Sequence, residues 1–337
     1  MSNKILITGG AGYVGSHVLK ALVDAKATDV VVLDNLSTGF SENVIDAKLI
    51  QGDILDFPLV SNILKTQKIQ TVMHFAAKTV IPESIQDPLK YYETNVLGTL
   101  KLLQACLQNQ VNHFIFSSTA AVYGGNTTHN IKESSTTLPL HAYGHSKLMA
   151  EQIIKDVANT SALRYVILRY FNVAGADPSG LIGQRDSHSP HLIKIALQNA
   201  CGLQKSMPIF GNDYPTPDGT CIRDFIHVSD VASAHVKALS YLNEGGGSKI
   251  FNCGYGNGFS VKEVIDAVKN ICQSEINTYI APRREGDVSR VVADSTQIQQ
   301  DLNWQPQYHD LNFIIKTALA FEKQLLGLPV VIYRSPL

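Results

Sequence analysis

A glycine-rich turn near the start of the chain constrains the fold more than any other feature of the sequence. An apolar run at residues 4–8 predicts a buried strand, and Gly9, Gly12 and Gly15 follow it at three-residue intervals. A helix with one apolar face is expected over about residues 13–26. Glycine lets the main chain turn tightly and bring its amides against a pyrophosphate at a helix N-terminus. The pattern predicts the first strand–turn–helix unit of a dinucleotide-binding domain.

An acidic residue stands where such a domain holds its adenosine ribose. Asp34 follows the second expected strand, at residues 30–33, about 20 residues after the glycine turn. A carboxylate there accepts hydrogen bonds from the ribose and repels a 2′-phosphate, and the residues after it (NLS) include no arginine. The sequence therefore favours NAD over NADP. Asp53, after the third strand, is expected either at the adenine edge or as a helix N-cap.

Strand and helix patterns alternate through the first half of the chain. Further apolar strands are expected at residues 49–51, 72–75, 114–116 and 166–168, with helix-like stretches between them. Such alternation with short connections predicts an α/β fold with a Rossmann-type, doubly wound parallel sheet. We expect residues 1–172 to form this NAD-binding domain.

The composition changes after about residue 172. Loops rich in glycine, proline, serine and aspartate follow at residues 176–190 and 211–219. Further along, two strands are expected at residues 225–228 and 249–252, and two helices at residues 260–272 and 311–325. We expect the two strands to return to the main sheet. Residues 173–337 are thus predicted to form mainly a smaller substrate-binding lobe, woven into the first domain.

Composition argues against several classes of partner. The 337 residues carry a formal net charge of −1 and no run of lysine or arginine, so nothing favours nucleic acid or an anionic membrane. No apolar run reaches the roughly 20 residues that a membrane-spanning helix requires. The five cysteines are scattered and never in CxxC spacing. Their pattern disfavours a disulfide framework or a metal site and favours a reducing, cytoplasmic setting.

A tyrosine and a lysine four residues apart carry the candidate chemistry. Tyr143 and Lys147 stand on one face of an expected helix. A tyrosine has a pKa of about 10, and a nearby lysine cation favours its phenolate, which can take a hydroxyl proton while hydride leaves the same carbon. Thr119 ends the fifth strand at the carboxyl edge of the sheet, where ligands bind. Its hydroxyl is expected either to orient a substrate alcohol or to cap a turn.

These motifs together resemble the extended short-chain dehydrogenase/reductase superfamily. Longer segments narrow the likeness: in order, over nearly the whole chain, the sequence resembles the UDP-glucose 4-epimerase family. The segments that carry the resemblance are HFAAKTV (74–80), YYETNVLGT (91–99), RYFNVAGA (169–176), IFGNDYPTPDGTCIRDFIHVSD (209–230) and PRREGD (282–287). The likeness implies that NAD stays bound, takes hydride from C4 of a UDP-sugar, and returns it after the 4-keto sugar has turned over.

The resemblance implies a role for each matching residue. It makes Tyr143 the acid/base, Lys147 the residue that tunes it and anchors the nicotinamide ribose, and Thr119 the hydroxyl partner. Phe171 is expected near the nicotinamide and Asn95 toward the cofactor side of the site. The expected cofactor site as a whole comprises Gly9, Gly12, Tyr13, Val14, Gly15, Asp34, Asn35, Asp53, Ile54, Phe75, Ala76, Ala77, Asn95, Tyr143, Lys147 and Phe171.

The expected substrate site draws on both halves of the chain. Arg223 and Arg284 match family arginines, whose guanidinium groups neutralise a diphosphate through paired hydrogen bonds. His191 stands where many members have a diphosphate-binding asparagine, and its neutral ring can still donate one hydrogen bond. Asn172 is expected at the diphosphate, Phe210 near the uracil and Asp287 at the uridine ribose. The complete set is Thr119, Tyr143, Asn172, His191, Phe210, Arg223, Arg284, Asp287 and Val291.

Two further positions depart from the family pattern. Ala77 replaces a glycine, and the lysine that usually follows two places later stands one place early as Lys78, which leaves its reach toward the pyrophosphate open. Val291 stands where some members have tyrosine and others a small residue, beside the C2 substituent of the sugar. Because valine leaves more room than tyrosine, we expect UDP-N-acetylhexosamines to be accepted too.

Other functions share parts of this pattern. A nucleotide-sugar 4,6-dehydratase needs an added acid and base, but two alanines follow Thr119. A UDP-glucuronate epimerase or decarboxylase needs a cation for the C6 carboxylate, and none stands near Thr119 in the sequence. A non-catalytic NAD-sensing protein would lack the tyrosine or the lysine. The resemblance also implies a homodimer formed by helices at residues 89–109 and 143–159, whose apolar faces would otherwise simply pack on the sheet.

Overall fold

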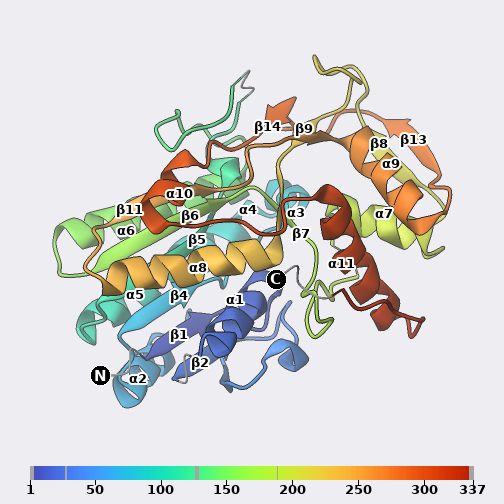
Figure 1. The fold of residues 1–337 in the computed structure, drawn as a ribbon. Coiled ribbons are helices and arrows are strands. Elements are labelled where there is room, and N and C mark those ends of the chain that lie inside the picture. The colour runs from blue at the N-terminus through green and yellow to red at the C-terminus, as the bar shows by residue number, and fades with distance from the viewer. Residues whose placement is uncertain (1–3, 27–28, 126–128, 188, 334–337) are drawn as a thin grey trace.

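The computed structural model of the protein describes residues 4–26, 29–125, 129–187 and 189–333. Within these residues, the centre is a parallel sheet of seven strands in the order β11-β6-β5-β4-β1-β2-β3 (Figure 1). The strands are β1 (Ile5–Thr8), β2 (Val30–Asp34), β3 (Lys48–Gln51), β4 (Thr71–His74), β5 (His113–Thr119), β6 (Arg164–Tyr170) and β11 (Lys249–Cys253). The strand order reverses between β1 and β4, so a ligand crevice opens at their carboxyl ends.

Helices cover both faces of this sheet, and an apolar core lies beneath each layer. One face is covered by α1 (Tyr13–Asp24), α8 (Val228–Asn243) and α10 (Thr296–Leu302). The other face is covered by α2 (Phe57–Gln67), α5 (Gly98–Gln108) and α6 (Ala142–Asn159). Figure 1 shows α1 and α8 side by side across the sheet. The predicted doubly wound α/β class is confirmed.

Short helical segments connect these elements near the crevice. The link from β4 to α5 consists of α3 (Ile81–Gln86), α4 (Pro88–Tyr91) and the π-helix η2 (Tyr92–Leu97). The 3₁₀ turns η1 (Ser41–Asn43) and η3 (Ala120–Val122) follow β2 and β5. A π-helix is rare and is frequent at functional sites, which directs attention to the residues of η2.

The second half of the chain builds a smaller lobe, at the right of Figure 1. Its helices pack around a separate apolar core and are α7 (Leu192–Ala200), α9 (Val261–Cys272) and α11 (Leu311–Leu325). Its described strands pair as β7 (Asn172–Ala174) with β10 (Phe225–His227), β8 (Met207–Phe210) with β13 (Thr278–Ala281), and β9 (Ile222–Arg223) with β12 (Phe259–Ser260) and β14 (Arg290–Val291).

Two expectations about these elements need correction. The segment at residues 249–252 returns to the main sheet as β11, as expected, but the segment at residues 225–228 does not, because β10 pairs with β7. β6 already has β5 and β11 as neighbours, which leaves no hydrogen-bonding edge for β10 there. Helix α1 ends at Asp24 rather than residue 26, because Lys26 adopts a left-handed conformation with φ of 61°.

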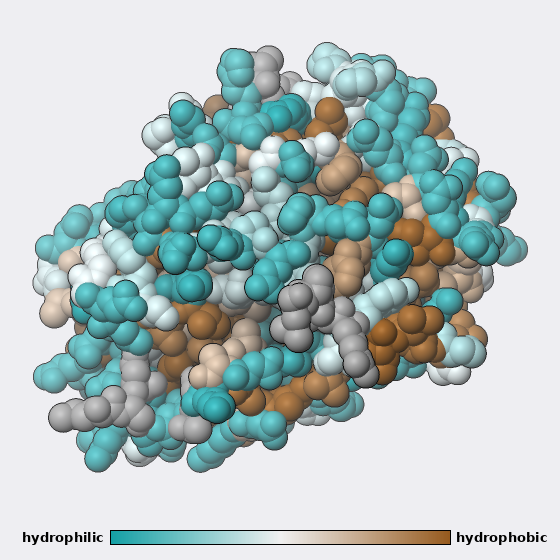
Figure 2. Space-filling model, viewed as in Figure 1, coloured by the Kyte–Doolittle hydropathy of each residue, from teal (hydrophilic) through white to brown (hydrophobic). Residues whose placement is uncertain are grey.

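The outer surface is mostly polar on the side seen in Figure 2. There hydrophilic residues cover most of the face, and hydrophobic residues lie in small, separate patches. None of the described helices combines the length and hydropathy needed to cross a bilayer.

Candidate active site

The glycine turn forms a close-packed cradle between β1 and α1. Gly9 has a φ of 73°, and a Cβ atom there would lie 2.5 Å from the main-chain nitrogen of Ala76. A Cβ atom at Gly15 would collide with the carbonyl oxygen of Gly9. Gly12 is the N-cap of α1 and places no side chain over the first amides of the helix. The turn therefore fits a pyrophosphate, which main-chain amides bind at close range.

Asp34 is held at the end of β2 with its carboxylate fixed. Its Oδ2 accepts a hydrogen bond from the main-chain N–H of Ala11 at 2.9 Å, and its Oδ1 accepts from that of Leu36 at 2.8 Å. The side chain is buried but lines the cavity beside the glycine turn. Each carboxylate oxygen can accept a second hydrogen bond. The arrangement suits the two hydroxyls of an adenosine ribose.

Asp53 is not the N-cap of the following helix. Its Oδ2 accepts from Asn35 Nδ2 at 2.8 Å, and its Oδ1 accepts from the main-chain N–H of Leu55. The cap of α2 is Asp56, whose side chain accepts from the N–H of Leu59. Of the two expectations for Asp53, the structure excludes the cap. Its position on the cavity wall next to Asn35 leaves the adenine-edge role as a proposal.

One cavity of about 1250 Å³ joins the glycine turn to the smaller lobe. Nearly all of the predicted site residues lie on its wall. They are Gly9, Gly12, Tyr13, Val14, Gly15, Asp34, Asn35, Asp53, Ile54, Phe75, Ala76, Ala77, Thr119, Tyr143, Lys147, Phe171, Asn172, His191, Phe210, Arg223, Arg284, Asp287 and Val291. Residues far apart in the sequence, from the glycine turn to the smaller lobe, thus line a single space.

Lys147 lies deep in this cavity and has few water contacts. Its Nζ donates a hydrogen bond to the carbonyl of Ser117 at 2.8 Å and lies 4.7 Å from the ring centre of Phe116. Burial lowers the pKa of Lys147 to about 7, against an opposing effect from Glu151 one turn later on α6. The ammonium group is therefore fixed at the end of β5, pointing toward the crevice.

Tyr143 and Thr119 face each other across the carboxyl end of β5. Burial raises the pKa of Tyr143, while a hydrogen bond with the Thr119 side chain lowers it. The Thr119 hydroxyl also accepts from the N–H of Ala121 at 3.1 Å, so it caps η3 and contacts the phenol at once. The hydrogen bond that Lys147 Nζ makes in this structure goes to the carbonyl of Ser117.

Asn95 lies behind the cavity wall instead of on it. This buried side chain, in the π-helix η2, accepts from the main-chain N–H of Lys78 at 2.8 Å and donates to the carbonyl of the same residue at 3.0 Å. It also donates to Ser146 Oγ at 2.9 Å, between Tyr143 and Lys147 on α6. Asn95 thus ties the loop after β4 to the helix that carries the candidate acid/base.

The substrate side of the cavity presents two guanidinium groups. Arg284 lies over the ring of Phe210, with 3.7 Å between its central carbon and the ring centre. Arg223 donates to Asp287 Oδ1 at 3.1 Å and to the carbonyl of Val288 at 2.8 Å. Stacking and carbonyl contacts fix both groups in place, which suits them to recognise an oxyanion.

A comparison with known proteins agrees with this geometry. Residues 5–254 match the family described as the NAD dependent epimerase/dehydratase family. The chain belongs to this family. NAD is therefore its cofactor, and the cradle at Gly9 and Gly15 with the fixed carboxylate of Asp34 fits that group.

Several epimerases of this family are similar over almost their whole length. The UDP-glucose 4-epimerase of Azospirillum brasilense is 47% identical over 96% of this chain and 93% of its own. The structure of the UDP-glucose 4-epimerase from Brucella ovis in complex with NAD superposes with a TM-score of 0.92 at 40% identity, covering 98% of this chain and 100% of that one. The UDP-Glc/GlcNAc 4-epimerase from Campylobacter jejuni gives 0.83 at 46% identity, covering 96% and 99%.

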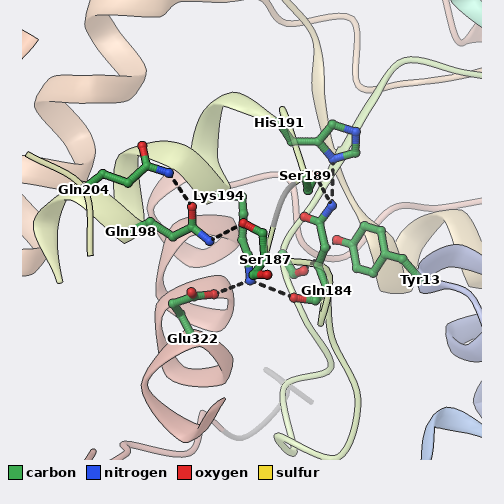
Figure 3. A network of polar contacts seen from close by, with 10 residues as sticks. Tyr13, Gln184, Ser187, Ser189, His191, Lys194, Gln198, Gln204 and Glu322 are labelled. Carbon is green, nitrogen blue, oxygen red and sulfur yellow. Dashed lines mark hydrogen bonds and ion pairs between the residues drawn. The ribbon is translucent and has the colours of Figure 1, made fainter. Parts of the chain in front are cut away.

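Sequence reasoning left the reach of Lys78 open and missed Gln184 and Lys194 in this epimerase-family site. Lys78 lines the cavity and approaches Ser37, where its Nζ lies 3.4 Å from the serine Oγ. Gln184 and Lys194 also line it, and Gln184 Nε2 donates to Nδ1 of His191 at 3.0 Å (Figure 3). The clue in the sequence was the loop at residues 176–190, because loops between two lobes often carry function. No group of three or more potential metal ligands gathers anywhere in the described chain.

Proposed function

We propose that the protein inverts the configuration at C4 of UDP-glucose and UDP-galactose, reversibly and with NAD retained. The observation that carries this proposal is the hydrogen-bonded pair of Tyr143 and Thr119 on the wall of a cavity that runs from the glycine cradle to Arg223 and Arg284. The likeness to UDP-glucose 4-epimerases over nearly the full chain supports the same conclusion.

The proposed mechanism assigns the proton transfer to Tyr143. NAD supplies the hydride acceptor and donor for the sugar carbon. The phenol oxygen of Tyr143 takes the proton of the C4 hydroxyl and later returns one, with Thr119 holding the shared hydrogen bond. The Lys147 cation favours the phenolate through space. Arg223 and Arg284 bind the diphosphate, so the sugar can turn over while the nucleotide stays in place.

A 4,6-dehydratase needs groups that this site does not offer at the matching place, and a UDP-glucuronate enzyme is distinguished from an epimerase by its product. A 4,6-dehydratase needs an acid and a base beside Thr119, where Ala120 and Ala121 form η3. A UDP-glucuronate epimerase or decarboxylase needs a cation for the sugar carboxylate. The mass of the product separates the reactions, because epimerisation conserves mass, dehydration removes water and decarboxylation removes carbon dioxide.

The substitution Tyr143→Phe tests the proposed acid/base. We expect kcat with UDP-glucose to fall by about 10²- to 10⁴-fold, since the phenyl ring keeps the shape and loses the proton-transfer group. The NAD released on denaturation should stay near one per chain. Tyr279→Phe is the matched control, because Tyr279 is exposed on β13, and it should leave kcat unchanged. Full turnover by the Tyr143 variant would overturn the proposal.

We further propose that UDP-N-acetylhexosamines are substrates. Val291, on β14, lines the cavity with a short side chain. The similar protein from Campylobacter jejuni is named a UDP-Glc/GlcNAc 4-epimerase, which supports this extension.

We also propose that the protein acts as a homodimer in the cytoplasm. Large apolar side chains are exposed on and beside the two expected dimer helices: Leu89 is 76% exposed, Leu97 41%, Leu107 42% and Met149 47%. Such side chains gain stability when a second copy covers them. All five cysteines are free thiols, as suits a reducing compartment.

A further inference from the structure

A polar network in the smaller lobe surrounds Gln184, beside the substrate cavity (Figure 3). The Gln184 side-chain nitrogen donates one hydrogen bond to Ser189 Oγ at 2.7 Å and another to Nδ1 of His191 at 3.0 Å. A carboxamide nitrogen has two hydrogens, so both are used. Nδ1 of His191 must then be the acceptor, and the neutral ring carries its single proton on Nε2.

Two hydrogen bonds from side chains of α7 hold the main chain around Gln184. Lys194 Nζ donates to the carbonyl of Gln184 at 2.9 Å, and Gln198 Nε2 donates to the carbonyl of Ser187 at 3.0 Å. Lys194 and Gln198 stand one helical turn apart, so one face of α7 holds two carbonyls of the loop. The contacts of Figure 3 therefore fix where the Gln184 amide points.

A buried ion pair fixes the position of Lys194, which holds the carbonyl of Gln184. Lys194 Nζ lies 2.5 Å from Glu322 Oε2 on α11, and both side chains are only 5% exposed. A lysine that shares its hydrogens between a buried carboxylate and a carbonyl has little freedom to move. The two helices and the loop thus form one rigid support for Gln184.

His191 stands at the end of this chain of contacts and lines the cavity directly before α7. Diphosphate oxygens only accept hydrogen bonds, so a ring nitrogen serves them when it carries a proton and repels them when it carries a lone pair. We propose that Gln184 is a positioning residue that sets the tautomer of His191 and so presents Nε2–H to the substrate diphosphate. This inference rests on the proposed function, because it requires a diphosphate at His191.

The charged groups around the ring decide how it responds to pH. Loss of hydration in the cavity lowers the pKa of His191, and Asp186 on the loop opposes this effect. Lys194 on α7 and Glu322 on α11 lie behind Gln184 and neutralise each other. The Gln184 N–H at Nδ1 also opposes a second proton on the ring, in the same direction as the loss of hydration.

Imidazole nitrogen shifts test the tautomer without reference to activity. We would record two-bond ¹H–¹⁵N spectra of the NAD-bound protein at pH 8. The signals missing from the His191→Gln variant belong to His191. We expect these signals to show the pattern of a ring protonated at Nε2. Gln184→Leu should convert it to a mixture of tautomers. The matched control Gln204→Leu should not, because the Gln204 side chain donates to Gln198 Oε1 at the far end of the network. A wild-type Nδ1–H pattern, or an unchanged pattern in Gln184→Leu, would refute the inference.

Kinetics provide the second readout. Gln184→Leu should raise the KM for UDP-glucose about tenfold and leave kcat within about twofold, as expected from loss of one charge-assisted hydrogen bond in the bound state. In Gln184→Glu, a carboxylate faces Nδ1 and raises the pKa of His191, so KM should rise from pH 6 to pH 8.5, whereas wild-type KM stays flat. Identical KM profiles in the two proteins would overturn the inference.

The two proposals fail in different ways. If the wild-type protein does not interconvert UDP-sugars, the proposed function is wrong, and so is the diphosphate role of His191. If it does interconvert them and His191→Ala leaves KM unchanged, the function stands and the positioning role is refuted.

Discussion

Val291 lines the cavity in which we propose that the sugar lies. A tyrosine at this position on β14 would place an aromatic ring in the cavity. The ring would clash with a bulky substituent at C2 of the sugar, because inserting extra atoms into a packed region is costly. We expect Val291→Tyr to lower kcat/KM for UDP-N-acetylglucosamine at least tenfold and to change that for UDP-glucose by less than about threefold. Initial rates with both substrates measure this ratio.

Val291→Ile is the matched control, because isoleucine adds a single methylene group. It should change the ratio of the two specificity constants by less than about threefold. An unchanged ratio in Val291→Tyr would mean that the side chain does not border the C2 substituent.

Single residues were predictable from the sequence where a local pattern fixes their place. Asp34 follows a strand at the spacing that a glycine turn requires, and Tyr143 and Lys147 share a helix face. Gln184 was not predictable, because its role arises from contacts with α7 and α11 that no spacing reveals. Asp53 could have been a ligand or a helix cap, and the structure decides against the cap because Asp56 caps α2.

At the scale of elements, a buried ion pair anchors the helix that carries Tyr143. Glu151 on α6 accepts from Arg169 Nε at 2.9 Å and Nη2 at 2.6 Å, and it also accepts from Ser118 Oγ. Arg169 in turn donates to Tyr123 Oη at 2.8 Å. These contacts join α6, which carries Lys147 one turn before Glu151, to β5 and β6 through a charged pair in the interior.

Removing one partner of this pair should be more costly than removing both. Arg169→Met leaves a fully buried carboxylate without its cation, and we expect the free energy of unfolding to fall by about 3–5 kcal/mol. The double variant Arg169→Met/Glu151→Leu should lie closer to wild type, because no isolated charge remains. Urea titrations of wild type, both single variants and the double variant measure the four values.

One outcome of these urea titrations would contradict the anchoring role of the pair. If the double variant is as unstable as the sum of the two single variants, the residues do not interact and the anchoring role of Arg169 is wrong.

Elements were predictable to the extent that their neighbours lie close in the sequence. The alternation of strands and helices predicted the main sheet, and α11 runs over the expected residues, Leu311–Leu325. The partner of β10 was not predictable, since the choice between β6 and β7 depends on whether β11 already occupies the edge. A short apolar run indicates a strand, whereas its pairing is decided by competition among distant segments.

At the scale of the molecule, four of the five buried histidines among the described residues make stability strongly sensitive to acid. Burial lowers the pKa of His17 and His235 to about 4 and that of His74 and His227 to about 3, from 6.5. The unfolded chain therefore binds more protons below pH 6.5, and stability is lost as the pH falls. From pH 6.5 to 5.5 we expect the free energy of unfolding to drop by about 4 kcal/mol, measured by urea titration.

A single substitution isolates one of these groups. Nδ1 of His17 donates to the carbonyl of Tyr13, and its buried Nε2 has no partner among the described residues. His17→Leu should reduce the loss between pH 6.5 and 5.5 by about 1 kcal/mol. Stability that does not change with pH over this range would show that the histidines titrate freely in the folded protein.

The proposed dimer is also a property of the whole molecule. Leu107→Glu/Met149→Glu puts two like charges on the exposed apolar side chains of α5 and α6, so association should be lost. Light scattering after size exclusion should give the mass of two chains for wild type and of one for the variant. Monomeric wild-type protein at micromolar concentration would refute the dimer.

The place of β11 at the edge of the main sheet has a consequence for synthesis on the ribosome. This strand pairs with β6 but is made after the loops, β8 and α8. At translation rates of about 5–20 residues per second, one edge of β6 stays unpaired for several seconds before β11 is synthesised. During that interval the nascent chain exposes an unpaired row of amides and carbonyls, and cutting the gene between the two lobes would make that exposure permanent.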